Sequence, residues 1–215
     1  MEKLKVLSLN CHGYNIGTAS YLDRLHSYCD VIFLQETWLS DCNAVKLDCL
    51  SENFKIFHTS AMEKKIKSGL MTGHPFGGTA ILVRKELAGY CYRVPTDDPR
   101  VTCVCVKRQG SPDIVFCSVY MPWNDRSLEQ MADYEATLGC LQGIIDRHIG
   151  CLFLLGGDFN VTKFSDNVCC QLLHQFSKSN KLSWLGIIDG GIDYTYHNDV
   201  SVTSACWIIS CHLLL

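Results

Sequence analysis

Several apolar segments of this chain stop abruptly at polar side chains, and this pattern constrains the fold more than any other feature. Leu4 to Leu9 ends at Asn10, and Val31 to Leu34 ends at Gln35 and Glu36. Short apolar runs of this kind are typical of buried β-strands. Because polar residues at the ends of buried strands face a cleft or solvent, the pattern indicates stacked sheets that present their strand ends at one edge.

A third segment of this kind carries the most chemical groups. Cys151 to Leu155 is apolar throughout and runs into Gly156-Gly157-Asp158-Phe159-Asn160. In an extended segment, residues two apart lie on one face, so Asp158 and Asn160 present their side chains together while Phe159 points into the core. Tyr120 closes a fourth strand in the same way.

The remaining segments predict strands that alternate irregularly with helices. Alternating or β-branched character predicts further strands at Lys55 to Thr59, Thr79 to Val83, Tyr90 to Val94, Thr102 to Val106, Ile114 to Val119 and Tyr194 to His197. Helix-start signals predict helices beginning at Ser20, from Ser127 to about Arg147, and from Asn167 to Ser177. This order favours an α/β fold of two packed sheets with helices outside, and the length favours one domain over residues 1–215.

The charge balance gives no general attraction toward a polyanion. Lys and Arg total 19 against 22 for Asp and Glu, so the net charge is -3. Lys64, Lys65 and Lys67 come closest to a basic patch, but such a stretch is more often a solvated loop. If nucleic acid is the substrate, local geometry must hold it.

The chain contains 14 cysteines, which is an unusual number for its length. Since the N-terminal segment lacks a signal-peptide core, we expect an intracellular, reducing environment and no disulfide-linked partner. No two cysteines are three positions apart, which argues against a zinc site. The apolar stretch Cys206 to Leu215 has about half the length needed to cross a bilayer, so we expect no membrane span.

The polar residues at the strand ends suit phosphoryl chemistry. Mg²⁺ takes one or two carboxylates and keeps its other positions for water and phosphate, so Glu36 is a natural ligand. Of Asp158 and Asn160, one can activate water while the other holds a phosphate oxygen. Each also has an ordinary explanation: Glu36 as a solvated loop residue, Asp158 and Asn160 as a turn, and Tyr120 as a strand-end aromatic.

Taken in order, these segments resemble the successive signatures of the endonuclease/exonuclease/phosphatase superfamily. The resemblance is carried by Leu7-Ser8-Leu9-Asn10, by Asp30 to Trp38 with its Gln-Glu-Thr-Trp, by Gly77-Gly78-Thr79-Ala80-Ile81, by Val119 to Pro122 and by Leu155 to Asn160. The spacing between Asn10 and Glu36 looks most like the endonuclease domains of non-LTR retrotransposons. The resemblance implies a four-layered α/β sandwich, with two packed mixed β-sheets flanked by helices.

The resemblance also implies a role for each residue at the strand ends. Glu36 would bind a divalent metal ion, Mg²⁺ or Mn²⁺, with support from Asn10. Tyr120 would contact the scissile phosphate. Asp158 would orient or deprotonate the attacking water, and Asn160 would fix the phosphate.

The C-terminal part matches the family pattern only partly. Asp193-Tyr194-Thr195-Tyr196 resembles the family's strand with a Tyr-Thr pair that lines the DNA-binding face, so the resemblance implies that Thr195 contacts a phosphate or sugar. The alternative is that Thr195 is an ordinary β-forming residue of a strand. Family members continue with Ser-x-x-Asp-His and later a final Ser-Asp-His. Here Ser204 is followed three residues later by Trp207, and no Asp or Glu occurs after Asp199. We therefore expect a domain that is incomplete at its C-terminus, lacks its last strand or strands, and is impaired in catalysis.

Three functional hypotheses follow from the sequence. The first is a Mg²⁺-dependent phosphodiesterase, most like a retrotransposon-derived DNA endonuclease, which would be nuclear if it acts on genomic DNA. The second is a small-molecule or lipid phosphatase of the same superfamily, for which Arg84 and His74 are the available contacts. The third is a non-catalytic nucleic-acid-binding remnant. The sequence does not define the oligomeric state.

Overall fold

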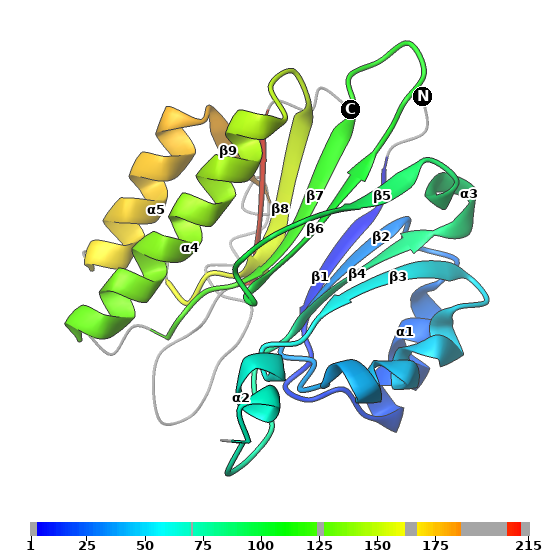
Figure 1. Cartoon of the computed structure of the whole chain (residues 1–215). Coiled ribbons are helices and arrows are strands. Elements are labelled where there is room, and N and C mark those ends of the chain that lie inside the picture. Colours follow the sequence, from blue (N-terminus) through cyan, green and yellow to red (C-terminus); the bar gives the residue numbers. More distant parts are fainter. Residues whose placement is uncertain (1–3, 70, 124–126, 162–166, 186–205, 212–215) are drawn as a thin grey trace.

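The computed structural model describes residues 4–69, 71–123, 127–161, 167–185 and 206–211. Within these residues the strands form a four-stranded and a six-stranded sheet. The two sheets pack against each other between two outer layers of helices (Figure 1). This arrangement is the predicted four-layered α/β sandwich with two mixed sheets.

The first sheet has the order β1 (Val6–Asn10), β2 (Val31–Gln35), β4 (Thr79–Arg84), β3 (Phe54–Thr59). β1 and β2 are parallel, and Asn10 lies opposite Gln35. The other neighbours are antiparallel. All five side chains of β2 are buried, because one face packs on the second sheet and the other on helices α1 (Ile16–Leu25) and η1 (Asp41–Leu50).

The second sheet has the order β5 (Cys91–Val94), β6 (Val101–Val106), β7 (Ile114–Tyr120), β8 (Leu152–Asp158), β10 (Cys206–Cys211), β9 (Leu182–Leu185). β7 and β8 are parallel, so their last residues, Tyr120 and Asp158, lie side by side. Helices α4 (Leu128–Arg147) and α5 (Val168–Ser179) cover the outer face of this sheet (Figure 1).

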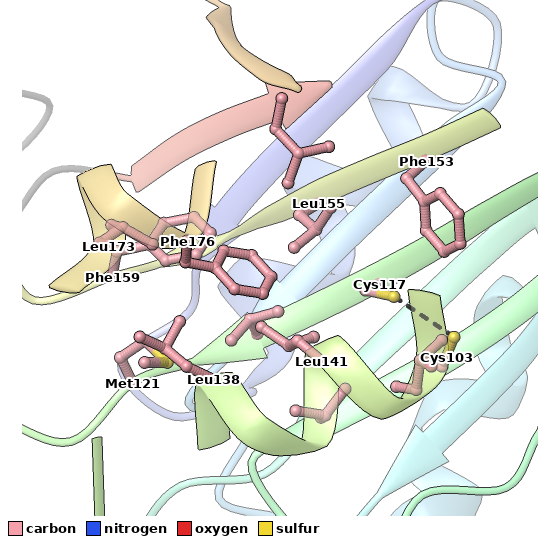
Figure 2. Close-up of a cluster of buried hydrophobic side chains, with 14 of the residues drawn as sticks. Cys103, Cys117, Met121, Leu138, Leu141, Phe153, Leu155, Phe159, Leu173 and Phe176 are labelled. Carbon is pink, nitrogen blue, oxygen red and sulfur yellow. Dashed lines mark hydrogen bonds between the residues drawn. The ribbon is translucent and has the colours of Figure 1, made fainter. Parts of the chain in front are cut away.

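The largest core lies between the second sheet and these two helices. Figure 2 shows how Leu138 and Leu141 of α4 and Phe176 of α5 pack over strand residues such as Leu155. Cys103 and Cys117 face each other in this core on neighbouring strands, with their sulfur atoms 3.3 Å apart. These cysteines therefore serve as small apolar core residues.

Two glycines before Asp158 allow the backbone of β8 to approach its neighbours closely. A β-carbon at Gly156 would lie 2.2 Å from Phe33 Cδ2 in the first sheet, and one at Gly157 would lie 2.2 Å from the carbonyl oxygen of Val119 in β7. Both distances are far shorter than a van der Waals contact. Gly156 therefore lets the two sheets approach each other, and Gly157 lets β8 lie close to β7 within its own sheet, where Asp158 emerges.

Several elements differ from the sequence-based predictions. α1 begins at Ile16 rather than at Ser20, because Asn15 caps it by accepting a hydrogen bond from Thr18 N at 3.1 Å. The Lys64 to Lys67 stretch, predicted as a loop, is part of a short helix, α2 (Glu63–Lys67). By contrast, α4 is confirmed with its cap, since Ser127 Oγ accepts from Gln130 N at 3.2 Å.

Four further elements were not predicted: η1, α3 (Lys85–Ala88), β9 and β10. Each is short or lacks a clear period, and tertiary contacts stabilise it. β10 lies within the apolar C-terminal stretch and pairs with both β8 and β9. The predicted strand at Tyr194 to His197 lies outside the described residues. In the described part of the chain, no helix is both long and apolar enough to span a bilayer.

We predict that Gly157→Ala destabilises the protein, because the new methyl group would collide with the rigid carbonyl of Val119. The free energy of unfolding should fall by at least about 2 kcal/mol in urea denaturation. The matched control is Gly139→Ala in α4, where a β-carbon meets no atom within 4 Å. That substitution should stabilise the protein by about 0.5–1 kcal/mol. An equal response of the two variants would contradict the close approach of β7 and β8.

Candidate active site

One amide group joins the ends of strands from both sheets. Nδ2 of Asn10, the last residue of β1, donates to Glu36 Oε1 at 2.7 Å and to Asp158 Oδ2 at 2.9 Å. The two carboxylates therefore lie no farther apart than the sum of these distances. That separation is well below the limit of about 12 Å beyond which one metal ion and one phosphate cannot bridge two carboxylates. The structure thus brings three of the five predicted catalytic residues into direct contact.

Glu36 is held by residues on both sides of it. Its Oε2 accepts from Trp38 Nε1 at 3.2 Å and lies 3.6 Å from His12 Nδ1. The ring of His12 packs edge-on against that of Trp38, with the ring centroids 4.7 Å apart. The side chain of Glu36 keeps 15% of its surface exposed, whereas that of His12 is 83% exposed. Glu36 therefore lies at the boundary between the core and solvent.

His12 and Trp38 are site residues that sequence reasoning missed. His12 lies two positions after Asn10, and its backbone N–H donates to Asn10 Oδ1 at 3.0 Å. Trp38 lies two positions after Glu36. His12, Glu36 and Trp38 all have positive φ, so these segments are not extended, and no periodic signal in the sequence identifies their contacts.

Asp158 is buried beside another carboxylate. Its Oδ1 accepts from Asn160 N at 3.1 Å, in addition to the bond from Asn10. Burial raises the pKa of the Asp158 carboxyl, and the negative charge of Glu36 raises it further, against the lowering effect of the two hydrogen bonds. The folded protein therefore holds this charge at a cost that a nearby cation would relieve.

Tyr120 and Asn160 complete the cluster. Burial raises the pKa of the Tyr120 hydroxyl, and the charges of Glu36 and Asp158 and a hydrogen bond to Glu36 add to this effect. The Tyr120 hydroxyl therefore stays protonated at neutral pH and can act as a hydrogen-bond donor. The side-chain amide of Asn160 donates to the carbonyl oxygen of Met121 at 2.6 Å, which fixes its position next to the end of β7.

The backbone around these side chains is strained. Among the described residues, positive φ outside glycine occurs at His12, Glu36, Trp38 and Asn160, and elsewhere only at Lys181. Such conformations cost energy and persist only where the surrounding structure enforces them, and they are often found at functional sites.

A buried hydrogen-bond chain fixes the two sheets to each other below the site. Gln35 Nε2 donates to Ser118 Oγ at 3.1 Å, and Ser118 Oγ donates to the carbonyl oxygen of Leu34 at 2.9 Å. Nearby, Thr79 and Thr102 join the sheets through hydroxyl groups 2.8 Å apart. Gln35, which the sequence places next to Glu36, is therefore a structural connection rather than a ligand.

His58 supports the segment that carries Glu36. Its Nε2 lies 3.1 Å from Thr37 Oγ1. Burial lowers the pKa of His58 to about 4, and the positive charge of Arg93 contributes. The imidazole is therefore neutral at physiological pH and acts as a hydrogen-bond partner rather than as a charge.

Other predicted contacts lie outside this cluster. Arg84 forms an ion pair with Asp30 at 3.2 Å and donates to the carbonyl oxygens of His26 and Cys29, at the opposite end of β4 from Thr79. It is not available as a phosphate contact, which corrects that suggestion. Thr195 lies outside the described residues.

A family model described as the endonuclease/exonuclease/phosphatase family matches residues 7–206. This match covers most of the chain, including all five residues of the cluster. The chain belongs to the endonuclease/exonuclease/phosphatase family. A comparison with curated proteins finds no significant match.

Solved structures of nucleic-acid enzymes share the fold. The endonuclease domain of TRAS1, a telomere-specific non-LTR retrotransposon, aligns with a TM-score of 0.67 at 14% identity, over 98% of this chain and 86% of that one. A 3' phosphatase, NExo, from Neisseria, bound to product DNA hairpin, aligns with a TM-score of 0.66 at 16% identity, over 97% of this chain and 87% of that one. The AP endonuclease LMAP from Leishmania major aligns with a TM-score of 0.71 at 12% identity, over 97% of this chain and 79% of that one.

The donor atoms of the cluster fit the divalent metal ions that members of this family generally use. Glu36 and Asp158 supply carboxylate oxygens, which Mg²⁺ and Mn²⁺ prefer over thiols. In the described part of the chain, no group of three or more His, Cys, Asp or Glu side chains is clustered closely enough to form a cage. A sparse set of ligands is what Mg²⁺ uses when water and substrate phosphate complete its shell.

We predict that Asn10→Ala destabilises the protein, because the buried oxygen of Asp158 and one oxygen of Glu36 lose their shared donor. The free energy of unfolding should fall by about 1–3 kcal/mol. Asn43→Ala, a matched change at an exposed position of η1, should change it by less than about 0.5 kcal/mol. If urea denaturation shows the two variants to be equally stable, the Asn10 amide does not hold the carboxylates.

Proposed function

We propose that this chain is a divalent-metal-dependent phosphodiesterase of the retrotransposon endonuclease type, which nicks DNA. The observation that carries the proposal is the pair of carboxylates, Glu36 and Asp158, held side by side by the amide of Asn10. The structural likeness to the TRAS1 endonuclease domain supports it. If its substrate is genomic DNA, the protein acts in the nucleus.

Glu36 is the proposed ligand of the metal ion, Mg²⁺ or Mn²⁺, because its carboxylate is partly exposed and is fixed by Asn10 and Trp38. Asn10 supports the ion indirectly by setting the position of Glu36. When bound, the ion would supply positive charge against a phosphate oxygen.

Asp158 is the proposed group that orients the attacking water and takes its proton. Each carboxylate oxygen has two lone pairs, and each oxygen of Asp158 accepts one hydrogen bond from the protein. One lone pair on each oxygen thus remains for a water proton. A raised carboxyl pKa makes Asp158 a stronger base than an ordinary aspartate.

Tyr120 and Asn160 are the proposed phosphate contacts. Tyr120 keeps its proton at neutral pH, and the hydrogen bond that its hydroxyl makes to Glu36 can be exchanged for one to a phosphate oxygen when substrate binds. Asn160 is held against Met121 and so is oriented before substrate binds. Thr195 remains a proposed contact on the DNA-binding face.

Turnover by this chain should be slow. The register of β10 places the backbone of Trp207 opposite Gly157, one residue before Asp158. At this position the family pattern has an aspartate followed by a histidine, and a later Ser-Asp-His, whose Asp-His pair assists the metal ion and the phosphate, is also needed for full chemistry. Tryptophan supplies neither a carboxylate nor an imidazole, and the loss of one such role typically costs about 10²- to 10⁴-fold in rate.

Removal of a 3' phosphate from DNA is a second candidate activity. It is favoured by the structural likeness to the 3' phosphatase from Neisseria, which was bound to DNA. The small-molecule or lipid phosphatase hypothesis is weaker, because Arg84 is committed to an ion pair away from the site.

A plasmid-relaxation assay in Mg²⁺ tests the proposed function. The unmodified chain should convert supercoiled DNA to the nicked form slowly, and Glu36→Gln or Asp158→Ala should lower the rate by a further factor of about 10² or more. Asp146→Ala, at an exposed position of α4, should nick like the unmodified chain.

Three results would contradict this account. Nicking that persists in Asp158→Ala would place the chemistry elsewhere. Rapid nicking by the unmodified chain, abolished by Asp158→Ala, would show that Trp207 does not limit the reaction. DNA binding without any cleavage would favour the non-catalytic remnant.

A further inference from the structure

We propose that the connection between β3 and β4 is an arm that binds the phosphate backbone of duplex DNA next to the active site. This basic arm consists of residues 60–69 and 71–76 and contains helix α2. The inference deepens the proposed function, since it assigns the surface that holds the DNA substrate.

The arm starts and ends beside Glu36. Thr59 and Thr79 are paired at the ends of β3 and β4, and the arm leaves the sheet from this pair. The backbone N–H groups of Thr37 and Trp38 donate to the carbonyl oxygens of Gly78 at 3.2 Å and Gly77 at 2.8 Å. In Figure 1, α2 accordingly lies at the end of the sheets away from the N-terminus, where β1 finishes. The base of the arm therefore lies next to the segment of Glu36, and α2 is at the same end of the sheets as the carboxylate cluster.

The arm concentrates positive charge on a chain whose net charge is -3. Lys64, Lys65 and Lys67 are all exposed, and His74 is exposed as well. Glu63 is the only acid among residues 60–76, and its carboxylate is engaged by the backbone N–H of Asp41 at 2.7 Å. The outward face of the arm is therefore cationic.

The base of the arm is fixed before any ligand binds. Met62 is buried, and its N–H donates to the buried Ser60 Oγ at 3.1 Å. Arg93 donates to the carbonyl oxygen of His58 at 2.8 Å and to Thr59 Oγ1 at 2.7 Å. A fixed base reduces the entropy that the arm loses on binding.

The lysines are spaced for a phosphate backbone. Lys64 and Lys67 are three residues apart in α2 and share a face, whereas the ammonium group of Lys65 lies 4.7 Å from the centre of the Phe76 ring. A DNA strand carries one charge per about 3.4 Å, so a group of this size can meet two or three successive phosphates. Glu36 and Asp158 repel phosphate, and the neighbouring lysines provide the attraction that the site itself lacks.

The test compares two triple variants that lose the same charge. Lys64→Gln/Lys65→Gln/Lys67→Gln removes the cations of the arm. The control variant, Lys85→Gln/Lys178→Gln/Lys181→Gln, removes three exposed cations that lie outside the arm. Lys85 directly follows β4, and Lys178 and Lys181 lie at and just after the C-terminal end of α5. Thermal melting verifies that each variant is folded.

Fluorescence anisotropy with a duplex DNA of about 20 base pairs, in EDTA so that no cleavage occurs, gives the affinity at salt concentrations between about 50 and 200 mM. The arm variant should bind about 10-fold more weakly or worse at low salt. The slope of log affinity against log salt concentration should be shallower by about 2 to 3 for this variant, because each phosphate contact contributes about 0.9 to the magnitude of that slope. The control variant should bind like the unmodified chain.

The inference is overturned if both variants lose affinity equally, if neither does, or if the arm variant loses affinity for single-stranded RNA and keeps it for duplex DNA. Failure of the proposed function gives a different result. In that case the arm variant loses DNA affinity, yet plasmid DNA is not nicked in an Asp158-dependent manner.

Discussion

The site depends on one interaction, the pair of hydrogen bonds from the amide of Asn10 to Glu36 and Asp158. The three residues come from the ends of β1, β2 and β8, which belong to two different sheets. A neutral amide can donate to two carboxylates at once without neutralising either one. The result is a pair of negative charges that is positioned by the protein and compensated only in part, which is the arrangement that a hard cation and a phosphate can use.

The packing of the two sheets serves this interaction. Gln35 and Ser118 join β2 to β7 directly beneath the cluster, and Gly156 lets β8 approach Phe33. Small shifts between the sheets would separate Asp158 from Asn10, since the hydrogen bond between them spans the interface. The strained backbone of Glu36 is consistent with this demand, because a site that must hold its groups in advance of binding keeps conformations that a free chain would avoid.

The sequence alone was sufficient for the main features of the fold and for the cluster. The buried strands that end at Asn10, Glu36 and Asp158 can be recognised from short apolar runs in the sequence, and the order of these segments matches a known family. It was not sufficient for elements that depend on tertiary contacts. α2 has only five residues and is positioned by the buried Met62. The contact of Trp38 with Glu36 requires a positive φ at both residues, which nothing in their composition indicates.

The central claim is that Glu36 and Asp158 border a divalent cation site. Anomalous diffraction from crystals soaked in Mn²⁺ tests it most directly. The account predicts one strong anomalous peak at about 2.0–2.3 Å from a Glu36 oxygen and next to Asp158, and its loss in Glu36→Gln. A peak bound only by cysteine or histidine side chains elsewhere, or a peak at the cluster that persists in Glu36→Gln, would contradict the account.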